Sequence, residues 1–429
     1  MKAMVKLRRT RKTSGPAGVS RSTTTVEAGR IGTSADITET LARRPVCYRC
    51  TVTDSMDSNR KIASLLRDLA SVQQSAQSKW GYKRAASAIL GLDEPIEQYL
   101  LPNGTLRKIP NIGPSSTRVI LEVLQTGRSA IVDAAVGGSP HAHDVERARG
   151  LRENFLSRAQ VVAALADKRL GGPRLDDYRG DLQMHSTWSD GVEPLEALVN
   201  ACVARGYGYC AITDHSYGLK IAGGISMADL TRQHQEIDAL NRRFAGTFRM
   251  IKGIEANIRA DGSIDMTSEE LKTLELVVAA PHSALRTTSD QTARMISAVR
   301  QRSVHILGHP RGRKLSTRPG VTADWGLVFE AAAESGVAIE IDGDPSRQDI
   351  DFALAQRAIR AGCLFALDSD AHSSRELEYA ETAVAHARLA GIPKARVINT
   401  WEVERLLAWA AERGSVKTPR RRAKRRPRV

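Results

Sequence analysis

The sequence predicts an α/β protein in which a barrel of seven parallel strands and intervening helices follows a small all-α domain. From residue 178 onward, short apolar runs of strand-like composition alternate with segments of helical pattern. This alternation is typical of a parallel sheet, and about seven strands indicate a barrel one strand short of the common eight-stranded form. Before residue 128, by contrast, apolar residues recur at helical spacing.

Charge is concentrated at the two ends of the 429-residue chain, whose formal net charge is +15. Residues 1–30 hold eight Lys/Arg and one Glu, and residues 417–429 hold eight Lys/Arg and no acid. Both ends lack apolar periodicity, so we expect them to be disordered. Basic tails bind polyanions in a salt-dependent way, which favours nucleic acid as their partner; a purely solubilising tail is the alternative.

We expect five segments along the chain. They are a disordered basic segment (1–58), a helical DNA-binding domain (59–127), a helical linker (128–177), the barrel (178–412) and a disordered basic tail (413–429). No apolar run is long enough to span a bilayer, and no secretory signal is recognised, so no membrane partner is expected. The five cysteines lack a disulfide spacing, which favours the cytoplasm, with association to the nucleoid open. Cys47 and Cys50 form one CxxC, without the second pair that a zinc ribbon needs.

The helical domain contains a pattern typical of a helix-hairpin-helix. Apolar residues 62, 65, 66, 69 and 72 fall at helical spacing, and a second helix is expected to end near Leu90. The turn Asn111-Ile112-Gly113-Pro114-Ser115 then precedes an apolar helix that Gly127 ends. Such a turn exposes backbone N–H groups at a helix start, so we expect Asn111, Ile112, Gly113 and Ser115 to bind DNA phosphates. A helical pair that only packs is the alternative.

The elements of the barrel follow one another in a regular order. Strands are expected at 180–184, 209–213, 249–254, 275–280, 304–307, 337–341 and 364–368, and helices at 193–205, 227–244, 289–301, 322–335, 347–361, 374–390 and 402–411. Glycines at 206, 336, 362 and 391 stand where these helices should end.

Histidines, acids and one glutamine follow the predicted strands at the points where the strands end. They are Gln183, His185, Asp190, Asp214, His215, Glu255, His282, His309, Asp370 and His372. Residues at the carboxyl ends of parallel strands converge on one mouth of a barrel. Imidazole and carboxylate groups together suit zinc, manganese or iron. The sequence therefore predicts a metal site with several ions.

These positions lie in seven motifs that resemble, in order, those of the PHP (polymerase and histidinol phosphatase) superfamily. The motifs are Asp181-Leu182-Gln183-Met184-His185-Ser186, Ser189-Asp190-Gly191, Ile212-Thr213-Asp214-His215-Ser216, Gly253-Ile254-Glu255, Pro281-His282-Ser283, Gly308-His309-Pro310 and Ser369-Asp370-Ala371-His372. The resemblance covers 178–400 and is greatest to the C-terminal PHP domain of bacterial family X DNA polymerases, whose N-terminal domain the hairpin also resembles. It implies a distorted (βα)7 PHP barrel.

The resemblance implies up to three divalent ions, manganese or zinc. The ligands would be Gln183, His185, Glu255 and Asp370 for the first ion, Glu255, His282 and His309 for the second, and Asp190, His215 and His372 for the third. Glu255 and Asp370 would be catalytic, Asp214 would orient His215, and Arg313 or Arg347 would clamp phosphate, with a salt bridge as the alternative. Gln183 departs from the histidine usual in the family; its weaker amide ligand should favour manganese over zinc.

The implied activity is that of a metal-dependent phosphoric ester hydrolase acting on DNA, as a 3′→5′ exonuclease or a 3′-end phosphodiesterase. The segment between Gly127 and the barrel is too short for a polymerase palm, and residues 111–127 hold no lysine for lyase chemistry. We therefore expect neither polymerase nor lyase activity. Two alternatives stay open: a small-molecule phosphatase of the histidinol phosphatase type, and a non-catalytic DNA-binding scaffold, which Gln183 favours. No protein partner is predicted.

Overall fold

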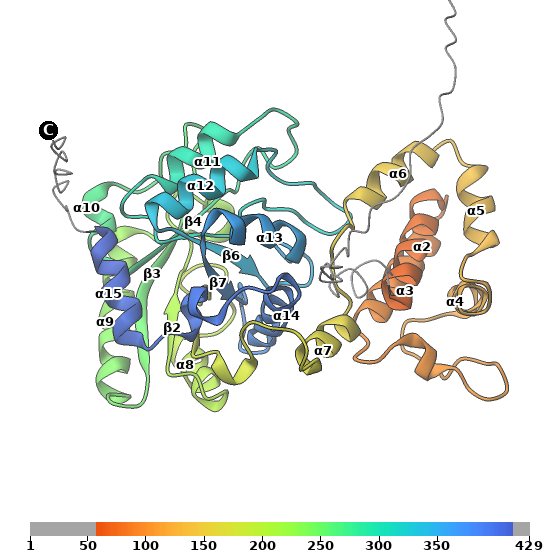
Figure 1. Cartoon of the computed structure of the whole chain (residues 1–429), viewed down its shortest axis with the longest axis horizontal. Helices are drawn as coiled ribbons and strands as arrows, with labels where there is room; N and C mark the ends of the chain where they lie inside the picture. The colour runs from red at the N-terminus through yellow and green to blue at the C-terminus, as the bar shows by residue number, and fades with distance from the viewer. Residues whose placement is uncertain (1–56, 415–429) are drawn as a thin grey trace, which may run out of the picture. The chain divides into compact units, whose positions relative to one another are not determined.

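The computed structural model describes residues 57–414. Most of the predicted disordered ends (1–58 and 413–429) and the Cys47–Cys50 pair lie outside the described residues, but residues 58, 413 and 414 are described and belong to helices. The first described part consists of helices around an apolar core of its own (Figure 1). Ile62 and Leu66 of the first helix pack there with Ile89 and Ile120, all of them fully buried. The helices are α2 (Ser58–Val72), α3 (Ala76–Leu90), η1 (Ile96–Tyr99), α4 (Pro114–Thr126), α5 (Ala130–Gly137) and α6 (Ala142–Gly150).

The predicted hairpin turn is present between η1 and α4. Asn111 has a φ of 64°, a left-handed conformation that asparagine adopts more readily than most residues other than glycine. The backbone N–H of Ile112 donates to the carbonyl of Ile109 at 3.3 Å. Helix α4 begins at Pro114 after Gly113, and no side chain caps its N-terminus. Its first N–H groups are therefore available to a ligand.

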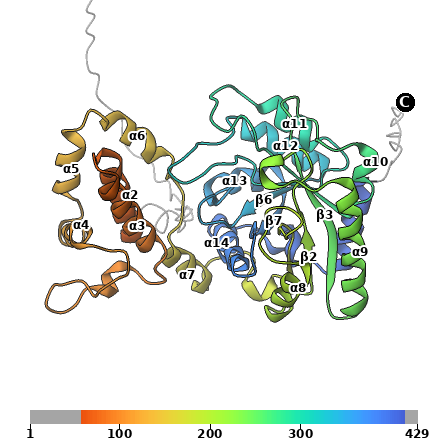
Figure 2. The same cartoon turned by 180° about the vertical axis from the view of Figure 1, so that it is seen from behind.

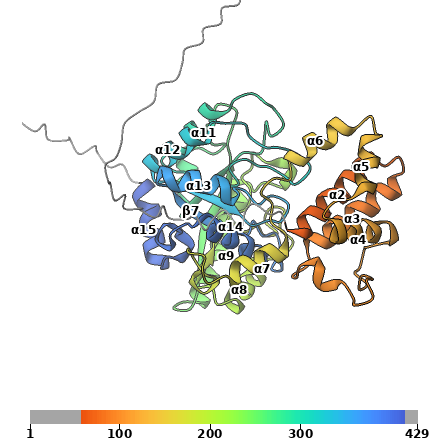
Figure 3. The same ribbon diagram turned by 45° about the vertical axis from the view of Figure 1, so that its right-hand side comes forward.

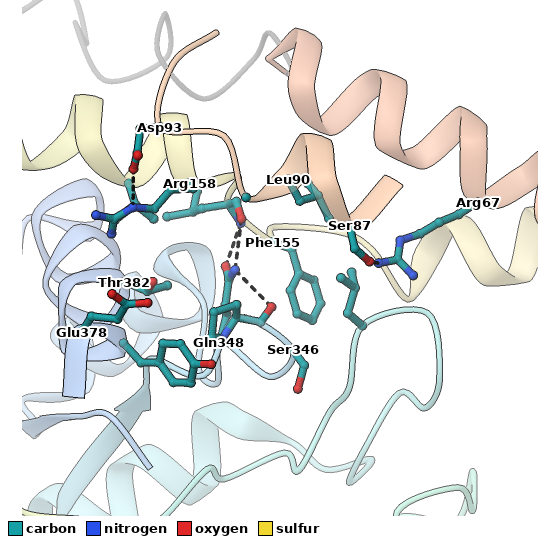
Figure 4. A pocket seen from close by; sticks show the side chains of 16 residues that line it. Arg67, Ser87, Leu90, Asp93, Phe155, Arg158, Ser346, Gln348, Glu378 and Thr382 are labelled. Carbon is teal, nitrogen blue, oxygen red and sulfur yellow. Dashed lines mark hydrogen bonds and ion pairs between the residues drawn. The ribbon is translucent and has the colours of Figure 1, made fainter. Parts of the chain in front are cut away.

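A linker that contains α7 (Arg158–Ala166) and η2 (Leu175–Asp177) leads to the barrel. Gln348 ties this linker to a barrel loop: its side chain accepts from the N–H of Leu156 at 2.7 Å and donates to the carbonyl of Leu156 at 3.1 Å. A pocket of about 520 Å³ opens beside this contact and is lined in part by Phe155 and Tyr379 (Figure 4). None of the predicted metal ligands lines that pocket.

Seven parallel strands form one sheet in the order β1 to β7, as the sequence predicted. The strands are β1 (Gly180–Asp181), β2 (Tyr209–Ile212), β3 (Arg249–Asn257), β4 (Leu276–Ala280), β5 (Ile306–Leu307), β6 (Ala338–Asp342) and β7 (Leu364–Asp368). They are enclosed by helices (Figures 2 and 3). These are α8 (Leu195–Ala204), η3 (Lys220–Ala222), α9 (Met227–Arg243), α10 (Ser268–Leu271), α11 (Thr292–Val299), α12 (Trp325–Ser335), α13 (Phe352–Ala361), η4 (Glu376–Tyr379), α14 (Ala380–Ala390), η5 (Lys394–Arg396), η6 (Ile398–Thr400) and α15 (Val403–Gly414).

Alternate residues of the strands pack into different cores. Val278 and Ile306 belong to one buried cluster, whereas Val277 and Leu307 belong to another that also contains residues of α11 to α14. Both faces of the sheet are therefore covered, which explains why the strands are continuous apolar runs.

A side-chain amide closes the seam between the first and last strands. The Nδ2 atom of Asn399 in η6 donates to the carbonyls of Gly180 at 3.0 Å and Leu367 at 2.9 Å, while its Oδ1 atom accepts from the N–H of Leu367 at 2.7 Å. Beyond the strand ends, Met184 forms a parallel bridge with Ala371. The seam thus places the residues after β1 beside those after β7.

Several element limits differ from the predictions, and one α-helix was not predicted. For example, β1 ends at Asp181 rather than at 184, and β5 begins at Ile306 rather than at 304. The predicted helix 347–361 begins only at Phe352, because Asp351 caps it by accepting from the N–H groups of Ala353 and Leu354. The short α10 was missed. In the part of the chain that the structure describes, no helix has the length and apolarity needed to cross a membrane.

Candidate metal centre

The chain beyond the strand ends brings eight of the nine predicted ligands together at the mouth of the barrel. Side-chain atoms suited to a metal converge in three groups: His185, Glu255 and Asp370 (first group); His215, Glu255 and His282 (second group); His185, Asp190, His215 and His372 (third group). Within each group the ligand atoms lie within 4.8 Å of one another. The eighth residue, His309, places its Nε2 atom 2.8 Å from Oε1 of Glu255. Glu255 belongs to two of these groups, as its predicted bridging role requires, and His185 and His215 also belong to two groups each.

Glu255, near the end of β3, lies between the first and second groups. Its Oε1 atom is 3.2 Å from Nε2 of His282, and its Oε2 atom is 3.4 Å from Nε2 of His185 and 3.1 Å from Nδ1 of His215. The side chain is fully buried. A carboxylate with both oxygens directed at different imidazoles is arranged to bridge cations.

Asp190 gives the third group its exposure to solvent. Its two carboxylate oxygens lie 3.5 Å from Nε2 of His215 and 3.5 Å from Nε2 of His372. The Asp190 side chain is 35% exposed and that of His372 is 28% exposed, whereas His185 is fully buried. The third group is therefore the most exposed to solvent of the three.

The ligand atoms fit a metal better than a hydrogen-bonded cluster. Buried atoms of these residues, including Glu255 Oε2 and the Nδ1 atoms of His185, His215, His282 and His309, have no hydrogen-bond partner among the described residues. Buried polar atoms are normally paired. Two pairs in the cluster are hydrogen-bonded, His309 Nε2 with Glu255 Oε1 and His185 Nε2 with Asp370 Oδ1. Glu255 Oε2 and His215 Nδ1, by contrast, lie 3.1 Å apart without hydrogen-bond geometry. Such atoms fit coordination to a shared cation instead.

Charge at the centre favours ionised carboxylates. Burial alone would raise the pKa of Glu255, but His215 and His282 outweigh it and hold the pKa well below its ordinary value. Burial would likewise raise the pKa of Asp190, and hydrogen bonds from His215 and His372 lower it instead. These carboxylates are therefore in the charged form that binds cations.

Two of the ligands have unusual backbone conformations. His309 has a φ of 20° and Asp370 a φ of 54°, both outside the range that most residues adopt. The N–H of His309 donates to the carboxylate of Glu340 in β6. Glu340 is fully buried, so this contact fixes the turn that presents His309.

Gln183, the ninth predicted ligand, lies beside Gly308, the residue before His309. It is fully buried, and neither its Oε1 nor its Nε2 atom has a hydrogen-bond partner among the described residues. A Cβ atom at Gly308 would come within 3.2 Å of this Oε1 atom. Its predicted role as a metal ligand stays a prediction.

The contacts of Arg313 do not fit the predicted phosphate clamp. Its guanidinium donates to the carbonyls of Arg347 at 3.0 Å, Glu153 at 2.9 Å and Gln348 at 2.6 Å, and it lies over the ring of Phe155. Only 6% of the residue is exposed. Arg313 is therefore a buried structural residue, which sequence alone could not show because its partners are carbonyls of distant loops.

Arg347 lies at the centre, but it is paired with an acid. Its Nη2 atom is 3.2 Å from Oδ2 of Asp370, and its Nε atom is 3.5 Å from Oδ2 of Asp344. Its side chain is 19% exposed. Burial would raise the pKa of Asp370, but Arg347 and His185 outweigh it and lower that pKa. The predicted alternative of a salt bridge is therefore present.

Asp214 was predicted to orient His215, but its hydrogen bonds go to other residues. Its carboxylate accepts from the N–H and Oγ of Ser186 at 2.8 and 2.6 Å, from Oγ of Ser189 at 2.5 Å and from Nε2 of Gln233 at 2.6 Å. None of these four donors belongs to His215. Asp214 instead fixes the loop between His185 and Asp190.

A group of buried acids below the ligands was missed. Asp181, Glu340, Asp342 and Asp368 are all fully buried. Burial, with Asp181 nearby, raises the pKa of Asp368 to about 8, and burial raises the pKa of Asp181 to about 6. The alternation Glu340-Ile341-Asp342 at the end of the predicted strand 337–341 was the available signal.

The predicted DNA-binding residues lie at the surface of the helical domain. Asn111, Gly113 and Ser115 are exposed, and Ile112 is half-buried against the apolar core. The turn therefore presents backbone while one side chain anchors it.

Comparison with known proteins supports both parts of the chain. A helix-hairpin-helix domain model matches residues 57–129. The chain is 35% identical over 226 residues to the DNA polymerase/3′-5′ exonuclease PolX of Bacillus subtilis, a match that covers 52% of this chain and 40% of that relative. The chain thus spans less than half of the length of PolX.

Other similar proteins are phosphatases by name. A probable phosphatase of Citrobacter koseri is 30% identical over 255 residues, which cover 56% of this chain and 98% of that protein. A solved histidinol phosphate phosphatase of Lactococcus lactis covers 49% of this chain and 94% of its own, with a TM-score of 0.37 and 18% identity. The near-complete match to the Citrobacter protein and the ordered motifs on a seven-stranded parallel barrel lead to one family. The chain belongs to the PHP (polymerase and histidinol phosphatase) superfamily, with a helix-hairpin-helix domain before its barrel.

Proposed function

We propose that this protein is a metal-dependent phosphoesterase that hydrolyses DNA from its 3′ end, as an exonuclease or a 3′-end phosphodiesterase. The observation that carries the proposal is the convergence of eight imidazole and carboxylate side chains around Glu255, with buried ligand atoms that no hydrogen bond satisfies. The name of the PolX relative, which includes a 3′-5′ exonuclease, supports DNA as the substrate.

The three groups would hold up to three divalent ions, manganese or zinc. Glu255 would be shared between the first two groups, and His282 with His309 would complete the second. When bound, such ions supply Lewis-acid activation of water and neutralise charge on the phosphate. Asp190 and His372 lie where the centre meets solvent, so they would position the ion nearest the entering phosphate.

The hairpin would hold the DNA backbone. The first N–H groups of α4 carry no side-chain cap, and helix N-termini bind phosphate through such groups. They recognise no base, so binding would be independent of sequence. The basic ends of the sequence would add a salt-dependent contribution.

The test is incubation of end-labelled single-stranded and duplex DNA with Mn²⁺ and purified protein. We expect loss of label with wild type and none with His282→Ala. His143→Ala is the matched control, because His143 is exposed on α6 and belongs to none of the three groups. Equal digestion by wild type and His282→Ala would overturn the proposal.

A second candidate is a small-molecule phosphatase. The match to the probable phosphatase of Citrobacter koseri, which covers 98% of that protein, favours it. Release of inorganic phosphate from small phosphomonoesters without any change in labelled DNA would select this function over the first.

A further inference from the structure

The three metal groups differ in how many ligands each has to itself. The second group has His282, with His309 beside it, and the third has Asp190 and His372. The first group shares His185 with the third and Glu255 with the second, so Asp370 is the only ligand that it does not share. When the other two groups are filled, the first has the fewest free donor atoms.

Asp370 is itself already paired with a cation. Nη2 of Arg347 is 3.2 Å from its Oδ2 atom, and His185 Nε2 is 3.1 Å from its Oδ1 atom. Asp342 and Asp344 lie 3.7 and 3.5 Å from Nε of the same guanidinium. A guanidinium stays charged at all ordinary pH values. A divalent ion at Asp370 would therefore adjoin a fixed positive charge held there by two further acids.

Gln183 is the further ligand that the sequence predicted for the first group, and it offers only a neutral amide. The side chain is fully buried without a hydrogen-bond partner among the described residues. Its Oε1 atom lies beside Gly308, the residue before His309. An amide oxygen is a weaker ligand for zinc than an imidazole nitrogen. Gln183 therefore does little to offset the repulsion from Arg347.

We propose that this protein retains two divalent ions, in the second and third groups, and that the first group binds its ion weakly and reversibly beside Arg347. This inference rests on the metal centre of the proposed function and assigns a different affinity to each part of it. Arg347 then supplies a permanent positive charge beside the first group.

Metal content tests the inference without any assay of activity. Wild type is loaded with Zn²⁺, passed over a chelating resin and analysed by inductively coupled plasma mass spectrometry. We expect two ions per chain for wild type and three for Gln183→His, which adds an imidazole. Three ions in wild type, or fewer than two, would overturn the inference.

Three further variants test the assignment of each group, with circular dichroism to show that each variant is folded. Gln183→Leu should still retain two ions, whereas His282→Ala should retain one. Arg347→Met should bind a third Zn²⁺ at least tenfold more tightly than wild type in a competition titration with a chromogenic chelator. Loss of an ion from Gln183→Leu, two ions in His282→Ala, or an unchanged third affinity in Arg347→Met would contradict the inference.

The metal-content test can fail or succeed independently of the test of the proposed function. Two retained ions without DNA hydrolysis would leave the inference intact and end the nuclease proposal. DNA hydrolysis by a protein that retains three ions would support the nuclease proposal and overturn the inference.

Discussion

The barrel mouth and the helical hairpin are both proposed to bind phosphate, but they are built from different chemical groups. The mouth uses side chains of buried residues such as Glu255 and His185. The hairpin uses backbone N–H groups at the exposed start of α4. At the mouth each binding group is a particular side chain, so its residue type is essential. At the hairpin the binding groups are backbone N–H groups, which many sequences can present. The comparison teaches that the loss of one residue should abolish function at the mouth and only weaken it at the hairpin.

Removal of metal should give the largest effect and should separate the two sites. We expect dialysis against a strong chelator to abolish hydrolysis, because no protein group replaces the Lewis acid. Binding of labelled DNA should persist, since the hairpin needs no metal. Hydrolysis rates and fluorescence anisotropy measure the two quantities. Loss of both on chelation would mean that the mouth, rather than the hairpin, holds the DNA.

Arg313→Met should reduce stability and leave hydrolysis nearly unchanged. Removal of a buried guanidinium leaves three backbone carbonyls without this donor and takes one of two cations from Asp351, 3.2 Å away. This should lower the free energy of unfolding by about 3 kcal/mol. Urea denaturation followed by circular dichroism measures this change. Arg360→Met, at an exposed position of α13, is the control and should change it by less than about 0.5 kcal/mol. A large loss of activity in folded Arg313→Met would instead support the predicted role of Arg313 in binding phosphate.

Asp214→Asn should have an intermediate effect on the mouth. The amide can accept at one atom only, so the loop that carries Ser186 and Ser189 loses part of its support. Residues that support metal ligands typically contribute about 10-fold to 100-fold in affinity or activity. We expect a loss of this size in the rate of hydrolysis, with DNA binding unchanged. An unchanged rate would show that the loop holds its shape without this carboxylate.

Asn111→Val should have the smallest effect and should be confined to the hairpin. Valine disfavours the φ of 64°, which should cost about 1–2 kcal/mol and distort the turn. We expect weaker DNA binding and a higher KM, with kcat unchanged. Asn111→Gly is the control, because glycine adopts this conformation freely. A fall in kcat with unchanged KM would contradict the proposed division of roles.

In both the barrel mouth and the hairpin, the sequence could predict features that depend on local patterns. The seven strands, their order and the convergence of the ligands follow from a regular alternation in which each strand ends beside a chemically distinctive residue. The positive φ of Asn111 could be predicted because few residue types tolerate it. The domain limits and the role of Gln183 stay predictions.

What could not be predicted depends on tertiary contacts. Arg313 follows a predicted ligand closely in sequence, but its carbonyl partners lie in loops around 153 and 347. Asp214 precedes His215, yet its partner Gln233 comes from α9. Proximity along the chain was therefore misleading for both residues.

The seam at Asn399 has a consequence for the order in which the protein can fold during its synthesis. His185 and Asp370 of the first group are 185 residues apart, and Asn399 joins β1 to β7 later still. The ribosome therefore completes the hairpin domain well before the last residues of the candidate metal centre are synthesised. A message broken before codon 399 would therefore yield a fragment that has the residues of the hairpin domain but lacks Asn399, which joins β1 to β7.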